Sequence, residues 1–282
     1  FAHRTYKLNR FWQFVLAFGA ETSAQKGVLW WAGYHRHHHR TSDQPTDIHS
    51  PLRGFWWSHV GWILCDKYKV TPYDDIQDFA KYPEIRWLSD NDLVPPTVLA
   101  LLCLFFFGLP GLMIGFFAST VVLWHGTFFI NSLTHIFGRR RYVTNDSSRN
   151  SAILAFITLG EGWHNNHHHY QSAARQGHKW WEFDFTFYGL KMMSWIGIVK
   201  NIRPVLKGIT KRKLIKDGHF DIGMFQTKLA KATDIIVAAK ESTGDYYGER
   251  RIAIETFVVK TKEQAEVLAR KSQKYSRPLQ KS

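Results

Sequence analysis

Histidine is the residue type whose number and spacing in this sequence could do chemistry, because 15 are present and many gather in two runs. The runs are GYHRHHHR at 33–40 and GWHNNHHHY at 162–170. Each run holds three histidines at positions i, i+3 and i+4, namely His35, His38 and His39, and His164, His167 and His168. On an α-helix these positions share one face, so each triplet is expected to point three imidazoles at one place. Imidazole is a ligand for iron, copper, zinc and nickel.

Other histidines differ in the role that their spacing predicts. His37 and His169 lie at i+2 and i+5 and are expected to point away from the ligand face. The stretch NSLTH at 131–135 adds Asn131 and His135, again at i and i+4. The candidate ligands then number seven histidines, more than the roughly six positions of one ion, so two ions are predicted. Ligand type leaves iron, copper and zinc open, and unrelated surface histidines are the competing interpretation.

Two uncharged runs separate these histidine stretches. Residues 93–107 and 112–130 contain no charged side chain, and GLPG at 108–111 joins them as a turn signal. The second run has 19 residues, or about 28 Å of helix, which is close to the thickness of a bilayer core. The runs therefore predict a transmembrane hairpin at about 93–130. The alternative is a pair of buried helices in a soluble core.

The distribution of basic residues predicts how the hairpin is oriented. Its turn has no Lys or Arg, whereas Lys81 and Arg86 precede it and three arginines at 139–141 follow it. By the positive-inside rule both flanks, and with them all the histidine runs, are expected on the cytoplasmic side.

Composition limits the remaining classes of function. The net charge of +14 suits anionic lipid surfaces, phosphorylated substrates or acidic protein partners, and no nucleic-acid recognition motif is present. The two cysteines are far apart and predict neither a disulfide framework nor a cysteine metal site. Residues 206–282 hold seventeen Lys and Arg against nine Asp and Glu, and are expected to form a basic, partly helical extension.

Six stretches of the chain resemble one known family. HRHHH at 35–39, NSLTH at 131–135 and GEGWHNNHH at 160–168 are similar to the histidine boxes of the membrane acyl-CoA (stearoyl-CoA, delta-9) fatty acid desaturases, especially the bacterial branch. SDQPTDIHSP at 42–51, GFWWSHVGW at 54–62 and WWEFDFTFYGLKMMSWIG at 180–197 also resemble it. The similarity covers roughly residues 1–205, which are therefore expected to form a desaturase domain.

The resemblance implies an all-α integral membrane protein with four transmembrane helices and a cytoplasmic helical cap that holds two iron ions. Carried over by position, the implied iron ligands are His3, His35, His38, His39, His135, His164, His167 and His168, with Asn131 acting through water. A ninth histidine and the first two membrane helices would lie before Phe1. The resemblance thus implies a truncated chain that carries two of the four transmembrane helices.

The resemblance also implies residues that contact the substrate. Trp31 matches a tryptophan that lines the bent acyl tunnel of the family, and Thr127 matches the threonine that pairs with it at the bend. Lys67 keeps one of two basic positions near the phosphates of coenzyme A, whereas Asp66 reverses the other. Outside the ligand set, Asp47, His49 and His59 are expected either to orient ligands or to cap loops.

The implied reaction is an O₂-dependent desaturation, in which a saturated acyl thioester gains a cis double bond at the delta-9 position and O₂ becomes two waters. The substrate would be acyl-CoA or another acyl thioester. Electrons would come from a ferredoxin or a cytochrome b5-like carrier with its reductase, because no flavin, haem or ferredoxin motif is present. A membrane di-iron hydroxylase and an inactive metal-binding membrane fragment are the alternative interpretations.

Overall fold

The computed structural model describes residues 1–215, 224, 227–229, 232–233, 259 and 263. Regular structure in this part of the chain is helical, and the only β pairing is isolated bridges such as that between Lys7 and Lys200. The α-helices are α1 (Arg10–Glu21), α2 (Val28–Thr41), α3 (Gln77–Ala80), α4 (Pro83–Asp90), α5 (Val94–Pro110), α6 (Ser119–Asn131), α7 (Ala152–Ile157), α8 (His164–His169) and α9 (Phe185–Trp195). Short 3-10 or π helices are η1 (Pro51–Arg53), η2 (Trp57–Gly61), η3 (Asp66–Tyr68), η4 (Tyr73–Asp75), η5 (Gly111–Ala118), η6 (Leu133–His135) and η7 (Ile209–Lys211). The all-helical expectation is confirmed for the described residues.

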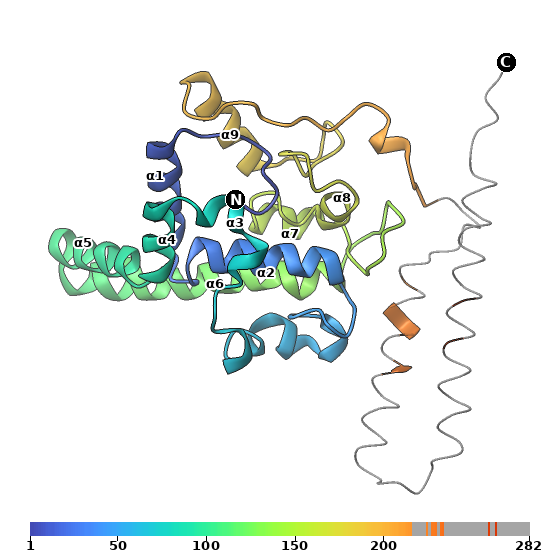
Figure 1. Cartoon of the computed structure of the whole chain (residues 1–282), viewed down its shortest axis with the longest axis horizontal. Helices are drawn as coiled ribbons and strands as arrows, with labels where there is room; N and C mark the ends of the chain where they lie inside the picture. The colour runs from blue at the N-terminus through green and yellow to red at the C-terminus, as the bar shows by residue number, and fades with distance from the viewer. Residues whose placement is uncertain (216–223, 225–226, 230–231, 234–258, 260–262, 264–282) are drawn as a thin grey trace, which may run out of the picture.

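Helix α2 occupies the middle of the described fold and carries the first histidine run (Figure 1). One core cluster packs Leu29 and Ala32 of α2 against residues of α1 and α4, and a second packs Trp30 against Ile48 and Trp62. The carboxylate of Glu21 accepts a hydrogen bond of 2.8 Å from the backbone N–H of Val28, which satisfies a free donor at the start of α2. The two core clusters on different faces of α2 and the hydrogen bond to Glu21 fix the orientation of this helix.

Helix α8 carries the second run and is held by its two asparagines. Asn165 Oδ1 accepts hydrogen bonds of 2.8 Å from the backbone N–H groups of Arg141 and Tyr142. Asn166 donates to Glu182 at 2.9 Å. The turn before α8 approaches α7 so closely that a Cβ at Gly162 would lie 2.0 Å from the backbone nitrogen of Ala155. These contacts set the position of a helix of only six residues.

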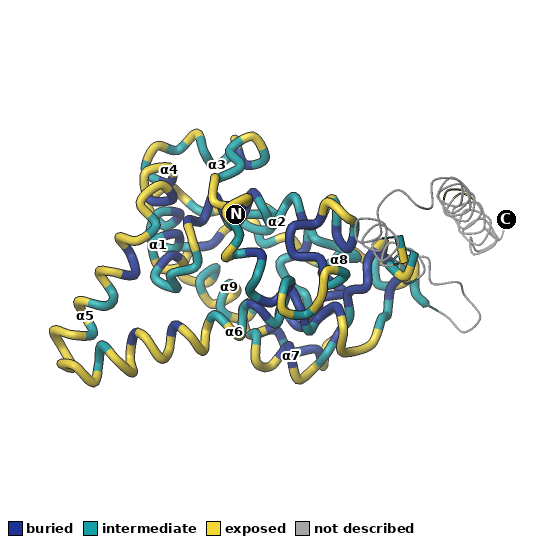
Figure 2. Tube along the Cα trace, turned by 90° about the horizontal axis from the view of Figure 1, so that it is seen from below, coloured by how far each residue is buried: buried dark blue, intermediate teal, exposed yellow. Residues whose placement is uncertain are grey.

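The uncharged runs form a helical hairpin that projects from the rest of the described fold (Figure 2). The helical stretch Val94–His135 is the one in the described residues that is long and apolar enough to cross a membrane, and its 18 most apolar consecutive residues have a mean hydropathy of 2.4. Gly108 breaks it with φ 64° and ψ −158°, and η5 packs back against α5. None of the 18 most apolar consecutive residues of this stretch is buried in the protein. A pair of buried core helices, the alternative interpretation, does not fit this exposure.

The basic extension predicted at 206–282 lies mostly outside the described residues. Residues Ile209–Lys211 form η7. The backbone N–H of Val143 donates to the oxygen of Lys213, and the backbone N–H of Ile215 donates to the oxygen of Arg141.

Candidate metal centre

Eight histidines from four separate parts of the chain converge in two groups. Group A consists of His3, His35, His39 and His167. Group B consists of His38, His135, His164 and His168. Within each group one ring nitrogen of every member lies within 4.8 Å of the others. The two groups adjoin, since the ring centroids of His39 and His168 are 4.5 Å apart. All eight histidines singled out by spacing and resemblance are thus brought together.

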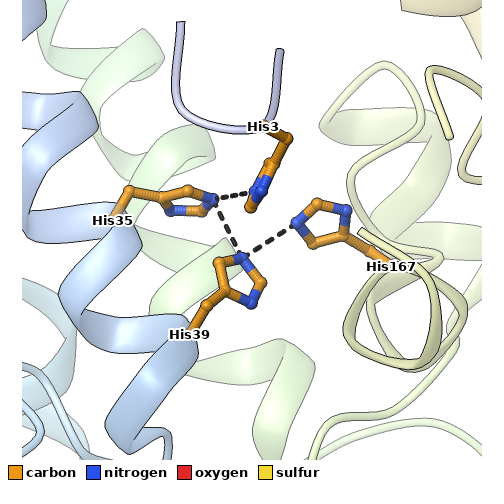
Figure 3. Close-up of side chains that lie close together, drawn as sticks. All are labelled: His3, His35, His39 and His167. Atoms are coloured by element: carbon orange, nitrogen blue, oxygen red, sulfur yellow. Dashed lines mark hydrogen bonds between the residues drawn. The ribbon is translucent and has the colours of Figure 1, made fainter. Parts of the chain in front are cut away.

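In group A the four rings point their Nε2 atoms at one another (Figure 3). The Nε2–Nε2 distance is 2.8 Å from His3 to His35, 3.0 Å from His35 to His39, and 3.0 Å from His39 to His167. Two nitrogens bound at right angles to one ion, each 2.0–2.1 Å from it, would lie about 2.9 Å apart. The spacing of these rings therefore fits metal coordination.

Each histidine triplet is divided between the two groups. The expectation that all three imidazoles of a triplet point at one place is therefore wrong. Helix α2 gives His35 and His39 to group A and His38 to group B. Helix α8 gives His167 to group A and two residues to group B. The cause is angular: neighbouring residues of a helix point about 100° apart, so each helix can serve two adjacent ions.

In group B three rings are held through their Nδ1 atoms by carboxylates. His38 lies 3.0 Å from Asp47, His168 lies 2.7 Å from Asp146, and His135 lies 3.3 Å from Asp43. These side chains are all buried. Because a carboxylate only accepts, each Nδ1 is the donor, and Nε2 keeps its lone pair for a metal.

Unpartnered nitrogens provide a test of whether metal ions fit. The buried Nε2 atoms of His38 and His168 have no hydrogen-bond partner within the described residues. Buried polar atoms without partners are costly, and a metal ion that accepts both Nε2 lone pairs would satisfy them. The donor set, rich in imidazole, suits iron, copper or zinc.

The pKa values in the two groups favour metal binding near neutral pH. Burial lowers the pKa of His35, His39, His164 and His167 well below its usual value, and neighbouring imidazoles lower it further. Burial also lowers the pKa of His3 to about 3. These imidazoles are therefore neutral near pH 7, the form that binds metals.

The hydrogen bonds between carboxylates and the rings of group B shift pKa values in the opposite direction to burial. Burial alone would lower the pKa of His135, but the Asp43 carboxylate raises it above its ordinary value. Burial alone would raise the pKa of Asp47, but the adjacent His38 holds it below its usual range. The Asp43 carboxylate therefore favours the protonated form of His135, and His38 favours the charged form of Asp47.

Histidines outside the two groups have other contacts. His37 Nε2 bonds to the backbone oxygen of Thr46, and His169 Nε2 bonds to that of Ile209, so both are confirmed to point away from the groups. The ring of His49 lies 4.1 Å from that of His38. His59 Nε2 lies 3.0 Å from Nδ1 of His125 in α6.

A pocket of about 570 Å³ opens beside group A. His3, His35 and His167 line it together with Trp31 and Thr127. The side chain of Gln25 donates to the Thr127 hydroxyl at 3.1 Å, and this hydroxyl donates to the backbone oxygen of Leu123 at 3.2 Å. Gln25 was not predicted, because nothing in its local sequence distinguishes it. Most of the remaining lining is apolar, which suits a hydrocarbon chain.

Lys67 lies away from this pocket. It lines a separate surface pocket of about 400 Å³ together with Arg53 and His37. Its ammonium lies 5.6 Å from the centre of the Tyr68 ring. The neighbouring Asp66 forms an exposed ion pair with Lys69. The arrangement as a whole places two adjoining sets of imidazoles beside an apolar pocket, with a basic pocket on the surface.

Comparisons with known proteins agree with this arrangement. The family model described as fatty acid desaturase matches residues 1–191. An sn-1 stearoyl-lipid 9-desaturase of Synechocystis is 38% identical over 206 residues, which are 72% of this chain and 64% of that protein. An acyl-CoA C20 Delta5-desaturase of Anemone leveillei is 34% identical over 75% of this chain and 69% of its own length. An sn-2 palmitoyl-lipid 9-desaturase of Nostoc is 34% identical over 71% of this chain and 72% of its own length.

The match to the first of these relatives covers less than two thirds of that protein's length. The family match covers more than half of this chain, and it includes all eight convergent histidines. The chain belongs to the fatty acid desaturase family, whose members are oxidoreductases.

Proposed function

We propose that this chain carries the catalytic centre of an O₂-dependent fatty acyl desaturase that introduces a cis double bond into a saturated chain. The observation that carries the proposal is the convergence of eight imidazoles in two groups beside an apolar pocket. Groups A and B would each hold one iron ion, with Asn131 contributing through water. The overall change converts one acyl chain, O₂, two electrons and two protons into an unsaturated chain and two waters.

The protein and the metal ions contribute differently to this reaction. The two iron ions would supply the oxidising power that no side chain provides for an unactivated methylene. The histidines hold the ions, and the pocket beside group A holds the acyl chain at a fixed distance from them. Trp31 and Thr127 line that pocket, where they would set the course of the chain and hence the position of the double bond. We assign this position as delta-9, which two of the relatives carry in their names, whereas the Anemone relative carries Delta5.

The bilayer is the proposed environment of the hairpin. Helix α5 and the η5–α6 arm are apolar and exposed, so we assign each as one crossing of the membrane. The basic residues at both ends of the hairpin support a cytoplasmic position for the histidine groups. A ferredoxin or a cytochrome b5-like carrier with its reductase would deliver electrons there, and the chain's charge of +14 suits an acidic carrier.

The proposed function is tested by expressing the full-length gene in cells and analysing their fatty acids by gas chromatography and mass spectrometry. The expected result is a new cis double bond at the delta-9 position. Hydroxylated chains without new double bonds would favour the hydroxylase alternative. Iron analysis of the purified protein should give about two ions per chain, and zinc at a single site would favour the inactive metal-binding fragment.

The surface pocket around Lys67 gives a prediction about the head group of the substrate. We propose an acyl-CoA thioester, because Arg53 and Lys67 would attract its phosphates. Lys67→Glu should raise the KM for acyl-CoA by about tenfold, since it replaces attraction with repulsion. Lys81→Glu is the matched control, because Lys81 also lies over a tyrosine ring, at 5.2 Å, but outside the pocket. Equal KM values for the two variants would place the head group elsewhere, as would conversion of acyl lipid alone.

A further inference from the structure

The two histidine groups differ in what supports their rings. In group B three of four rings bond to the buried carboxylates of Asp43, Asp47 and Asp146. In group A the hydrogen bonds found within the described residues join the histidines to one another. The difference is not imposed by the histidine spacing, because both helices contribute to both groups.

The groups also differ in what they face. Three members of group A, His3, His35 and His167, line the 570 Å³ pocket, and no member of group B does so. Four charged residues line the same pocket, two of each sign: Glu21, Glu161, Arg4 and Lys26. The Glu21 carboxylate accepts a hydrogen bond from the backbone N–H of Val28. Within the described residues, neither Glu21 nor Glu161 forms a hydrogen bond with a ring of group A. Group A therefore borders a pocket whose lining carries charges of both signs, whereas three rings of group B bond directly to buried carboxylates.

We propose that the two groups are unequal metal sites: Asp43, Asp47 and Asp146 make group B the tight site, which fills first, and group A is the exchangeable site facing the substrate pocket. This inference rests on the proposed metal centre. A carboxylate that accepts from a ligating imidazole fixes the ring and increases its basicity, and losing one such partner typically weakens metal binding 10- to 100-fold. Three carboxylates also attract a dication directly.

The first test measures how tightly the purified full chain holds cobalt(II). The cobalt-loaded protein is dialysed against increasing chelator, and cobalt per chain is determined by elemental analysis. Two separate losses are expected, with a plateau at one ion that spans at least about a tenfold range of chelator concentration. Loss of both ions in one step would overturn the proposal.

Ligand variants assign the plateau to a group. His35→Ala removes a ligand from group A, so this variant should load one ion and keep it as tightly as the wild type keeps its last. His168→Ala removes a ligand from group B, so its remaining ion should leave at the lower chelator concentration. The reverse assignment would contradict the proposal.

Carboxylate variants test the cause. Asp47→Asn and Asp146→Asn should each lose the tightly held ion at 10- to 100-fold less chelator, with the weaker ion unaffected. Asp184→Asn is the matched control, because Asp184 is buried and accepts backbone hydrogen bonds from Gln176 and Phe187 but contacts no histidine. Equal effects of the three variants would show that the carboxylates act only on the fold and would overturn the proposal.

A labelling measurement on the wild type covers the case in which variants do not fold. At the plateau, modification by diethylpyrocarbonate should reach group A histidines but not those of group B. The opposite pattern would refute the assignment. Desaturation of acyl-CoA is scored separately on iron-loaded protein with its electron donor. An active iron protein whose two cobalt sites are equal would refute only this inference, whereas unequal cobalt sites with an inactive iron protein would refute only the proposed function.

Discussion

Replacing His167 with alanine should abolish desaturation, with a fall of more than about 100-fold in product formed per chain. His167 is the one member of group A that comes from α8, and its Nε2 lies 3.0 Å from that of His39. Removing it leaves three imidazoles, all on the N-terminal part of the chain, to hold one ion. Because even the partners of metal ligands contribute 10- to 100-fold to binding, loss of a ligand should cost more. Product is measured in membranes by mass spectrometry, and iron per chain should fall by about one ion.

His169→Ala is the matched control, since it removes an imidazole from the same helix and the same run. The His169 ring stacks on Tyr142 with centroids 4.0 Å apart, and its Nε2 bonds to the backbone oxygen of Ile209. It therefore supports local packing but has no access to either group. Activity of the control should stay within about twofold of the wild type. If both variants were equally inactive with unchanged iron, the role assigned to His167 would be wrong.

Much of this centre was predictable because helical spacing is a local property. The i, i+3 and i+4 pattern identified the faces of α2 and α8, and the structure brings all six of their histidines together with His135 and His3. How the triplets divide was not predictable. Whether His38 joins His35 or His164 depends on how α2 packs against α8, and helix packing is set by side chains far away in the sequence.

The groups that support the histidines were mostly missed for the same reason. Asp43 reaches His135 across 92 positions, and Asp146 lies in an irregular segment before α7. An aspartate in a loop is usually a solvated turn residue, so its type carries little information about a partner. Asp47 was left open between orienting a ligand and capping a loop, and it bonds both to His38 and to the backbone N–H of Asp43.

The hairpin was predictable as a shape, since two uncharged runs around a Gly/Pro turn leave few alternatives. Composition alone could not separate a membrane hairpin from two core helices, because both are apolar throughout. The exposure of the hairpin argues against two core helices: Leu101, in the middle of α5, is 59% exposed, and Val122, in the middle of the η5–α6 arm, is 72% exposed. A large exposed apolar surface of this kind is typical of a membrane or protein contact, and under the proposed function a bilayer would cover it.

Leu101→Arg should therefore prevent stable insertion of the first arm. An arginine near the middle of a membrane helix costs about 2.5–3.5 kcal/mol, which is roughly a 60- to 300-fold shift in an insertion equilibrium. Cys103 lies on the same arm, and Cys65 lies outside the hairpin; both are partly exposed in the protein itself. In broken membrane fragments, a membrane-impermeant maleimide should label wild-type Cys65 and leave Cys103 unmodified. In Leu101→Arg the labelling rate of Cys103 should rise at least about tenfold.

Val70→Arg is the matched control, because Val70 is 76% exposed but lies outside the hairpin. The same charge there should change neither the labelling of Cys103 nor the amount of protein in the membrane pellet. Equal labelling of Cys65 and Cys103 in the wild type would mean that no bilayer covers the arm. The membrane assignment would then fail while the geometry of the two histidine groups stood, since Leu101 and Cys103 belong to neither group.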